Sequence, residues 1–145
     1  MDIYKRLQDD HRRQRKLAEK VEDTSGDSED RRRLFAEFKQ EAEAHANAEE
    51  QTFYAALLED PDAQEKARHS ISEHKEAADL LDELSDLDMA SSQWIRTFKQ
   101  LVEDLEHHMD EEEDEVFELA RSVIDAETAQ AMVADFEERK AAEAS

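Results

Sequence analysis

Two stretches of the chain decide its fold and share one pattern: HANAE at residues 45–49 and HMDEE at residues 108–112. Each begins with a histidine and ends with a glutamate four residues later, and the two stretches are 63 residues apart. A further histidine precedes each stretch by 34 residues, at His11 and His74. Residues four apart on an α-helix lie on the same face, one turn from each other. Each stretch can therefore direct a nitrogen and an oxygen toward one point.

Three breaks divide the chain into predicted helices. The first is Thr24-Ser25-Gly26-Asp27-Ser28, which combines the single glycine with residues that favour a helix N-cap. The second is Asp60-Pro61, where aspartate suits the N-cap and proline the first helical position. The third is diffuse and lies between Ser85 and Ser92, and a weaker break near Asp125 begins a tail helix. The expected elements are four long helices and a tail helix, at about residues 2–22, 28–59, 61–85, 89–124 and 125–142.

The four histidines lie at matching distances from these breaks. The midpoint of His11 and His45 is residue 28, that of His45 and His74 is 59.5, and that of His74 and His108 is 91. In an up-down-up-down bundle, residues equally far from a turn on adjoining helices lie at one level. We therefore expect an all-α, antiparallel up-down-up-down four-helix bundle with a short fifth C-terminal helix. One histidine from each long helix contributes to a common layer.

These residues also lie on the apolar side of each predicted helix. The stripes at helical spacing are Tyr4, Leu7, His11, Ala18 and Val21; Leu34, Phe38, Ala42, His45, Glu49 and Ala56; Ala67, Ile71, His74, Ala78 and Leu81; and Phe98, Leu101, Leu105, His108, Glu112 and Leu119. A carboxylate on such a stripe is costly to bury unless it is paired or binds a cation. The candidate metal ligands are therefore His11, His45, Glu49, His74, His108 and Glu112.

Five other side chains are possible site residues. His69 and His107 have no partner under the 63-residue shift, and they lie roughly 140° and 100° around the helix from the nearest pattern histidine. We predict that both are non-ligands. For Tyr4, a packing role in the core is a better interpretation than a role as hydrogen-bond donor to the site. Asp10 and Glu73 correspond to each other under the 63-residue shift, and each could orient a histidine on a neighbouring helix. In so acidic a chain, we expect both carboxylates to face solvent instead.

Composition limits the possible partners. The chain has 145 residues, a formal net charge of −22 and no cysteine. Such negative charge argues against nucleic acid or an anionic membrane as partner. The absence of cysteine excludes disulfides, iron–sulfur clusters and a thiol nucleophile. We expect one cytoplasmic domain over residues 1–145, with a metal-binding bundle at 1–124 and a tail helix that covers a bundle edge or forms a homodimer contact. Its apolar content is low, so a metal would supply much of the stability.

The ligand set indicates which metal is bound. Four neutral nitrogens and two carboxylates, without sulfur, are too many ligands for one tetrahedral zinc ion. The nitrogen content disfavours calcium and magnesium. The set suits two octahedral first-row ions that share carboxylates, so we expect two iron ions, with manganese as the alternative. Ferritin-like bundles use Glu-x-x-His and mostly carboxylates, whereas this chain has His-x-x-x-Glu.

The sequence resembles the hemerythrin-like, HHE cation-binding family over about residues 1–124. The resemblance rests on Asp10-His11, HANAE at 45–49, Glu73-His74 and HMDEE at 108–112. Members of that family are antiparallel four-helix bundles with a non-heme di-iron centre, which the likeness implies here. Under the resemblance, the four histidines match terminal iron ligands and the two glutamates match bridging carboxylates.

The chain departs from the oxygen-carrying hemerythrins in two places. Those proteins have two histidines four apart on the third helix and His-x-x-x-x-Asp on the fourth. Here the positions four from His74 are Ser70 and Ala78, and the last carboxylate is Glu112 at a spacing of four. The resemblance thus implies more open ions that bind or react with O2, NO or H2O2, or that handle iron. The alternative is an enzyme with peroxidase-like, catalase-like or NO-reducing activity. A metal-free structural bundle is disfavoured because both glutamates would be buried without partners.

Overall fold

The computed structural model describes residues 1–144, and in this range the chain is helical with short connections. Two of the long helices are continuous, α1 (Ile3–Glu22) and α4 (Gln64–Asp86). The other two each contain a π-helical segment. The second long helix consists of α2 (Glu29–Glu49), η1 (Glu50–Tyr54) and α3 (Ala55–Leu58). The fourth long helix consists of α5 (Ser92–Glu111), η2 (Glu112–Val116) and α6 (Phe117–Val123). The tail helix is α7 (Ala126–Ala144).

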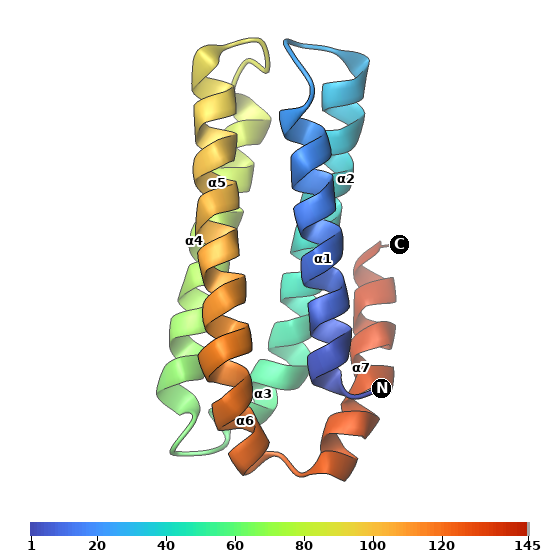
Figure 1. Ribbon diagram of the computed structural model, residues 1–145, viewed down its shortest axis with the longest axis vertical. Helices are drawn as coiled ribbons and strands as arrows, with labels where there is room; N and C mark the ends of the chain where they lie inside the picture. The colour runs from blue at the N-terminus through green and yellow to red at the C-terminus, as the bar shows by residue number, and fades with distance from the viewer. Residues whose placement is uncertain (145) are drawn as a thin grey trace.

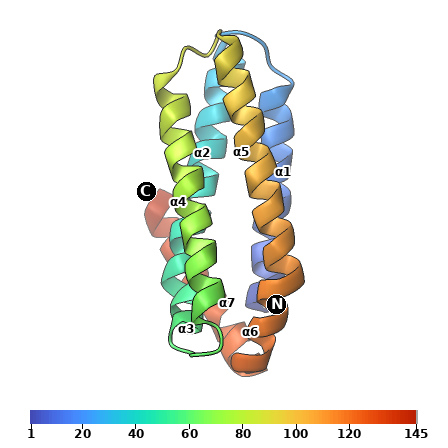
Figure 2. The same cartoon turned by 90° about the vertical axis from the view of Figure 1, so that its left-hand side faces the viewer.

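The four long helices run alternately up and down, as the sequence predicted (Figure 1). The α1–α2 and α4–α5 connections lie at one end of the bundle, and the α3–α4 and α6–α7 connections lie at the other (Figure 2). The fifth helix, α7, lies outside the ring of four and packs against α2 and α1. The predicted fold is therefore confirmed, and the tail helix covers one edge of the bundle.

Local capping explains most of the helix starts. Asp2, Ser28 and Ser91 each accept a hydrogen bond from the backbone N–H three residues later, at the N-termini of α1, α2 and α5. Gly26 adopts φ 63° in the first connection, a left-handed conformation that suits glycine. The predicted start of the third helix at residue 61 is wrong. Asp60 accepts from the N–H of Asp62 within a turn, and the regular helix begins only at Gln64.

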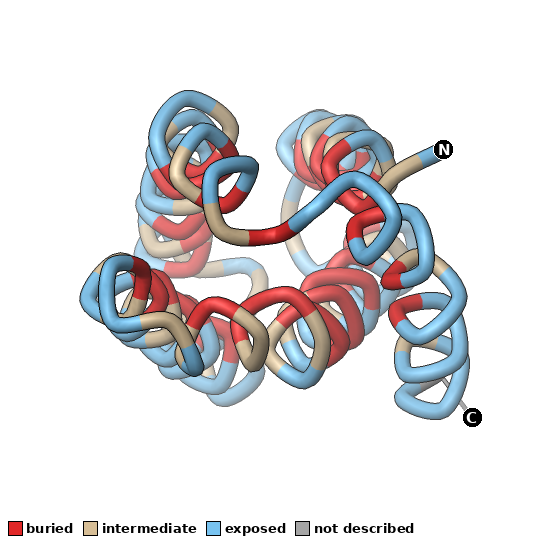
Figure 3. Tube along the Cα trace, turned by 90° about the horizontal axis from the view of Figure 1, so that it is seen from below, coloured by how far each residue is buried: buried red, intermediate tan, exposed pale blue. Residues whose placement is uncertain are grey.

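Buried residues face the interior of the bundle along all four long helices (Figure 3). They form two apolar clusters at different heights. We call the cluster next to the α1–α2 connection the upper core, and its large members are Phe35, Phe38, Leu81, Leu84, Trp94, Phe98 and Leu101. The lower core, near the N-terminus and α7, includes Ile3, Tyr4, Leu7, Phe53, Tyr54, Leu57, Phe117 and Phe136. The pattern histidines and glutamates lie in neither cluster.

No helix within residues 1–144 combines the length and the apolar character needed to cross a membrane.

Candidate metal centre

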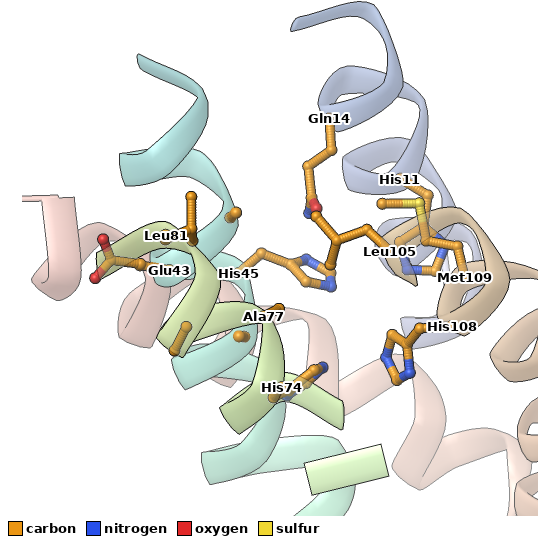
Figure 4. A pocket seen from close by; sticks show the side chains of 13 residues that line it. His11, Gln14, Glu43, His45, His74, Ala77, Leu81, Leu105, His108 and Met109 are labelled. Atoms are coloured by element: carbon orange, nitrogen blue, oxygen red, sulfur yellow. The ribbon is translucent and has the colours of Figure 1, made fainter. Parts of the chain in front are cut away.

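The structure brings all six predicted site residues together in one buried layer. Each histidine comes from a different long helix, and their rings converge in the middle of the bundle (Figure 4). Both glutamates are fully buried, with 0% of their surface exposed. The histidines are buried as well. A layer of ionisable side chains thus lies inside a small protein, where each needs a partner to offset its desolvation.

The histidines form two pairs, and each glutamate lies between the pairs. Ring centroids are 5.4 Å apart for His11 and His45, and 4.8 Å apart for His74 and His108. Glu49 Oε1 lies 3.6 Å from Nε2 of His45 in the first pair and 3.2 Å from Nε2 of His74 in the second.

Glu112 is placed in the same way on the other side of the layer. Its Oε1 lies 3.1 Å from Nε2 of His11, and its Oε2 lies 3.6 Å from Nε2 of His108. Each carboxylate can therefore be shared between two ions, one at each histidine pair. The potential ligand atoms of His11, His45 and Glu49 all lie within 4.8 Å of one another, as do those of Glu49, His74 and His108.

A carboxylate from a neighbouring helix or turn orients each of the four rings. In every case Nδ1–H donates, because a carboxylate oxygen only accepts. The four contacts are His45 to Asp10 at 2.8 Å, His108 to Glu73 at 2.9 Å, His11 to Glu113 at 2.7 Å and His74 to Glu50 at 2.8 Å. With Nδ1 engaged, a neutral ring presents the lone pair of Nε2 to the interior, which is the arrangement of a metal ligand.

The expectation that Asp10 and Glu73 face solvent is wrong. Asp10 is buried and Glu73 is half-buried, and both hold a histidine. Sequence reasoning missed Glu50 and Glu113, which do the same for the other two rings. A signal was present, since Glu50 and Glu113 also match under the 63-residue shift. The duplication therefore includes the orienting carboxylates as well as the six pattern residues.

The carboxylates change the pKa values in this layer. Burial by itself lowers the pKa of His11 and of His74, but hydrogen bonds with the adjacent glutamates outweigh it and raise both to about 9. Burial is likewise outweighed at His108, where Glu112 and Glu73 raise the pKa to about 10. The layer therefore favours positive charge at the histidine positions, the electrostatic condition for holding cations.

Several buried atoms in the layer have no hydrogen-bond partner. They are both carboxylate oxygens of Glu49, Oε1 of Glu112 and Nε2 of His108. Leaving a buried carboxylate unpaired costs several kcal/mol, about the desolvation penalty of an ion in a protein interior. The contacts of Glu49 with His45 and His74, and of Glu112 with His11 and His108, place these atoms next to the histidine pairs. The residues present thus fit one or more bound cations better than they fit a metal-free core.

Tyr54 is a further site residue that sequence reasoning missed. It is fully buried, and its hydroxyl donates to Glu112 Oε2. Burial, together with the charges of Glu112 and Glu49, raises the pKa of Tyr54 well above its ordinary value. The phenol therefore keeps its proton and remains a hydrogen-bond donor to Glu112.

Both π-helical segments lie next to the pattern glutamates. η1 begins one residue after Glu49, and η2 begins at Glu112. In η1 the hydroxyl of Thr52 donates to the carbonyl of Ala48, a contact that competes with the regular helical ladder. Such segments often occur at functional sites. Here they widen one turn in each glutamate-bearing helix, and η1 contains Glu50 and Tyr54.

A small cavity of about 40 Å³ adjoins the layer on the side of the upper core. All four pattern histidines line it, and most of its other lining residues are apolar: Ala42, Ala46, Ala77, Ala78, Leu81, Leu105 and Met109. The lining also includes the exposed residues Glu43 and Ala78, so the cavity reaches the surface between α2 and α4. The cavity is large enough for a few small atoms.

His69 and His107 lie outside this layer. Both are exposed, and His107 is 73% exposed at its side chain. Nε2 of His69 lies 3.6 Å from Glu73 and 3.4 Å from Glu111. Together, His69, Glu73 and Glu111 form a surface group that is geometrically able to hold a cation. Tyr4 packs edge-on against Phe117 in the lower core and does not contact the layer.

The fold and the buried layer define a four-helix bundle with a buried histidine–carboxylate cluster that could hold metal ions. The family model for the hemerythrin HHE cation-binding domain matches residues 2–120, and the chain belongs to that family. It is similar to the crystal structure of a hemerythrin HHE cation-binding domain-containing protein from Mycobacterium kansasii, with a TM-score of 0.83 and 25% sequence identity. That match covers 98% of this chain and 89% of the other. No curated protein matches the chain.

Proposed function

We propose that this HHE protein holds two iron ions in the buried layer and binds a small diatomic molecule or peroxide at them. The proposal depends on the buried carboxylate of Glu49. Both of its oxygens are buried without a hydrogen bond, while Nε2 of His45 and His74 approach one of them to within 3.6 and 3.2 Å. Nitrogen and oxygen lone pairs that converge in this way repel each other unless a proton or a metal ion lies between them, and shared carboxylates beside four imidazoles favour a metal ion.

Charge and geometry favour two ions over one. Six carboxylates lie in or against the layer, at Asp10, Glu49, Glu50, Glu73, Glu112 and Glu113. Among residues 1–144, the lysine and arginine side chains that contact them are Arg6, Lys140 and Arg15. When the histidines are neutral, as metal ligands are, the carboxylates outnumber these basic side chains, which favours more than one divalent cation. Each central glutamate also contacts one histidine from each pair, so two ions can share both carboxylates.

The donor set favours iron, with manganese as the alternative. Imidazole nitrogens suit first-row transition metals, and carboxylates suit harder ions of the same row. Bound iron would supply open coordination positions and a redox couple for a small molecule. The chain supplies the surroundings: carboxylates that fix the four rings, a cavity lined by those rings, and apolar cavity walls.

Metal content tests the proposal directly. Reconstituted with ferrous iron under anaerobic conditions, the wild-type chain should retain about two equivalents after desalting, and His45→Ala should retain clearly fewer. His107→Ala is the matched control, because this exposed histidine lies outside the layer, and it should behave as wild type. Equal iron content in wild type and His45→Ala would overturn the site. Competition with manganese in the same assay decides the metal.

An enzyme is the second candidate, and two observations favour it. The cavity reaches the surface between α2 and α4, and the buried phenol of Tyr54 is a hydrogen-bond donor to Glu112. Such an arrangement suits repeated reaction with H2O2 as well as binding. Turnover of H2O2 by the loaded protein, above that of the same amount of free iron, would establish the enzyme. Binding of NO without such turnover would establish a binding protein.

A further inference from the structure

Gln14 is a polar residue on the inner face of α1, three residues after His11. It is only 3% exposed, and its amide nitrogen has no hydrogen-bond partner. Its side chain lines the cavity, and the carboxamide projects toward His45 and Leu105 (Figure 4). A buried amide without a partner lowers stability, because its hydration is lost without compensation. An apolar side chain of similar length would avoid that loss.

The repeat shows that a polar group is not needed at this level of the bundle. Under the 63-residue shift Gln14 corresponds to Ala77, which lines the same cavity from α4. Each lies three residues beyond its pattern histidine. The cavity is therefore asymmetric, with an amide above the His11–His45 pair and a methyl group above the His74–His108 pair.

Few other groups in the cavity lining could bind a ligand by a hydrogen bond. The four histidines have their Nδ1 atoms engaged by carboxylates and direct Nε2 to the layer. Glu43 is exposed at the mouth and can only accept when ionised. The remaining lining residues are alanine, leucine and methionine. Gln14 is thus the neutral donor inside the cavity.

We infer that Gln14 determines ligand specificity: its carboxamide donates a hydrogen bond to the small molecule that occupies the cavity, at the end above His11 and His45. This inference rests on the proposed function. The cavity volume of about 40 Å³ holds roughly three or four water-sized atoms, since one water needs ~10–15 Å³. The ligand class is therefore a diatomic or linear triatomic molecule with a hydrogen-bond acceptor at its outer end.

The test compares Gln14→Met and Gln14→Leu with wild type, using azide as the probe. Methionine matches glutamine in length and leucine is shorter, so the pair separates loss of the donor from filling of the cavity. Gln130→Met is the control, because Gln130 is exposed on the tail helix α7. The measurements are iron content, azide affinity, the infrared stretching frequency of bound azide, and the melting temperature of each chain without metal.

We expect both Gln14 variants to retain the wild-type iron content and to bind azide about tenfold more weakly, in line with loss of one hydrogen bond to a charged group. The stretching frequency should shift in both, and Gln130→Met should match wild type. Without metal, both variants should melt at the wild-type temperature or a few degrees higher.

Unchanged azide affinity and frequency in both Gln14 variants would overturn the inference while leaving the metal centre intact. A lower melting temperature without metal would also overturn it, because Gln14 would then have a structural role. If wild type itself retains no iron, both the proposed function and this inference fail.

Discussion

Two buried tyrosines show how a single contact decides the role of a residue. Tyr4 and Tyr54 both lie in the lower core. The hydroxyl of Tyr54 donates to Glu112, whereas the hydroxyl of Tyr4 has no hydrogen-bond partner. Tyr4 instead packs its ring against Phe117 and beneath the guanidinium of Arg121. Tyr54 therefore contacts the candidate metal centre, and Tyr4 belongs to the core.

Removing each hydroxyl tests this assignment. Tyr54→Phe should lower the free energy of unfolding of the metal-free protein by about 1.5–3 kcal/mol, because it removes a hydrogen bond to a buried charged group. Tyr4→Phe makes the same chemical change at a site with no bond to lose, so it should be neutral within ~0.5 kcal/mol or stabilising. Urea unfolding of both variants gives the comparison. Equal losses would show that the contact between Tyr54 and Glu112 contributes nothing.

At the scale of elements, the tail helix α7 contacts the candidate metal centre indirectly. Lys140 on α7 lies 2.9 Å from Asp10 and 2.7 Å from Glu41, and Asp10 in turn holds the ring of His45. Phe136 packs edge-on against the same ring at 5.7 Å. No lysine or arginine within residues 1–144 contacts the corresponding carboxylate, Glu73. We propose that α7 and the bundle form one domain, because the tail helix supports one of the two histidine pairs.

Lys140→Met should destabilise the protein, because Asp10 and Glu41 would keep their buried negative charges with less compensation. The expected loss is about 1–3 kcal/mol, less than for a fully buried pair because Lys140 retains some exposure. Lys75→Met is the control, since the exposed pair of Lys75 and Asp79 should contribute under ~0.5 kcal/mol. Denaturant unfolding and iron retention are both measured. A Lys140 variant as stable as the Lys75 variant would show that α7 does not support Asp10.

At the scale of the whole molecule, a layer of ionisable side chains separates two apolar cores. The net charge of −22 adds self-repulsion throughout the chain. Cations in the layer would relieve the repulsion where it is most concentrated and would connect all four long helices. The bundle should therefore depend on its metal for stability far more than a protein with one continuous core does.

Removal of the metal should lower the melting temperature by roughly 10 °C or more, as expected for a ligand well above its dissociation constant. Added sodium chloride should recover only part of this loss, because salt screens exposed charges more than buried ones. Calorimetry of loaded and chelated protein, at low and high salt, measures both effects. His45→Ala should respond little to chelation. An identical melt with and without chelator would contradict a stabilising metal.

The sequence by itself determined the helices, their antiparallel order and the six residues of the layer. These features follow from local rules: caps and breaks at neighbouring positions, apolar residues at helical spacing, and a repeat that can be counted along the chain. The matched distances from the turns then place one histidine of each long helix at one level, as in the contact of His11 with His45. The same repeat included the orienting carboxylates, but acidic residues are so common in this chain that their match carried little weight.

The tertiary structure decided what depends on how the helices are rotated against each other. The contact between His11 and Glu113 joins residues 102 apart, and that between Lys140 and Asp10 joins residues 130 apart. The donor role of Tyr54 depends in addition on the wide turn at η1. Helical spacing specifies which face a residue occupies, but the angle at which two faces meet is set by packing across the whole bundle. The difference between Gln14 and Ala77 can be interpreted only from the structure, which shows that both residues line the same cavity.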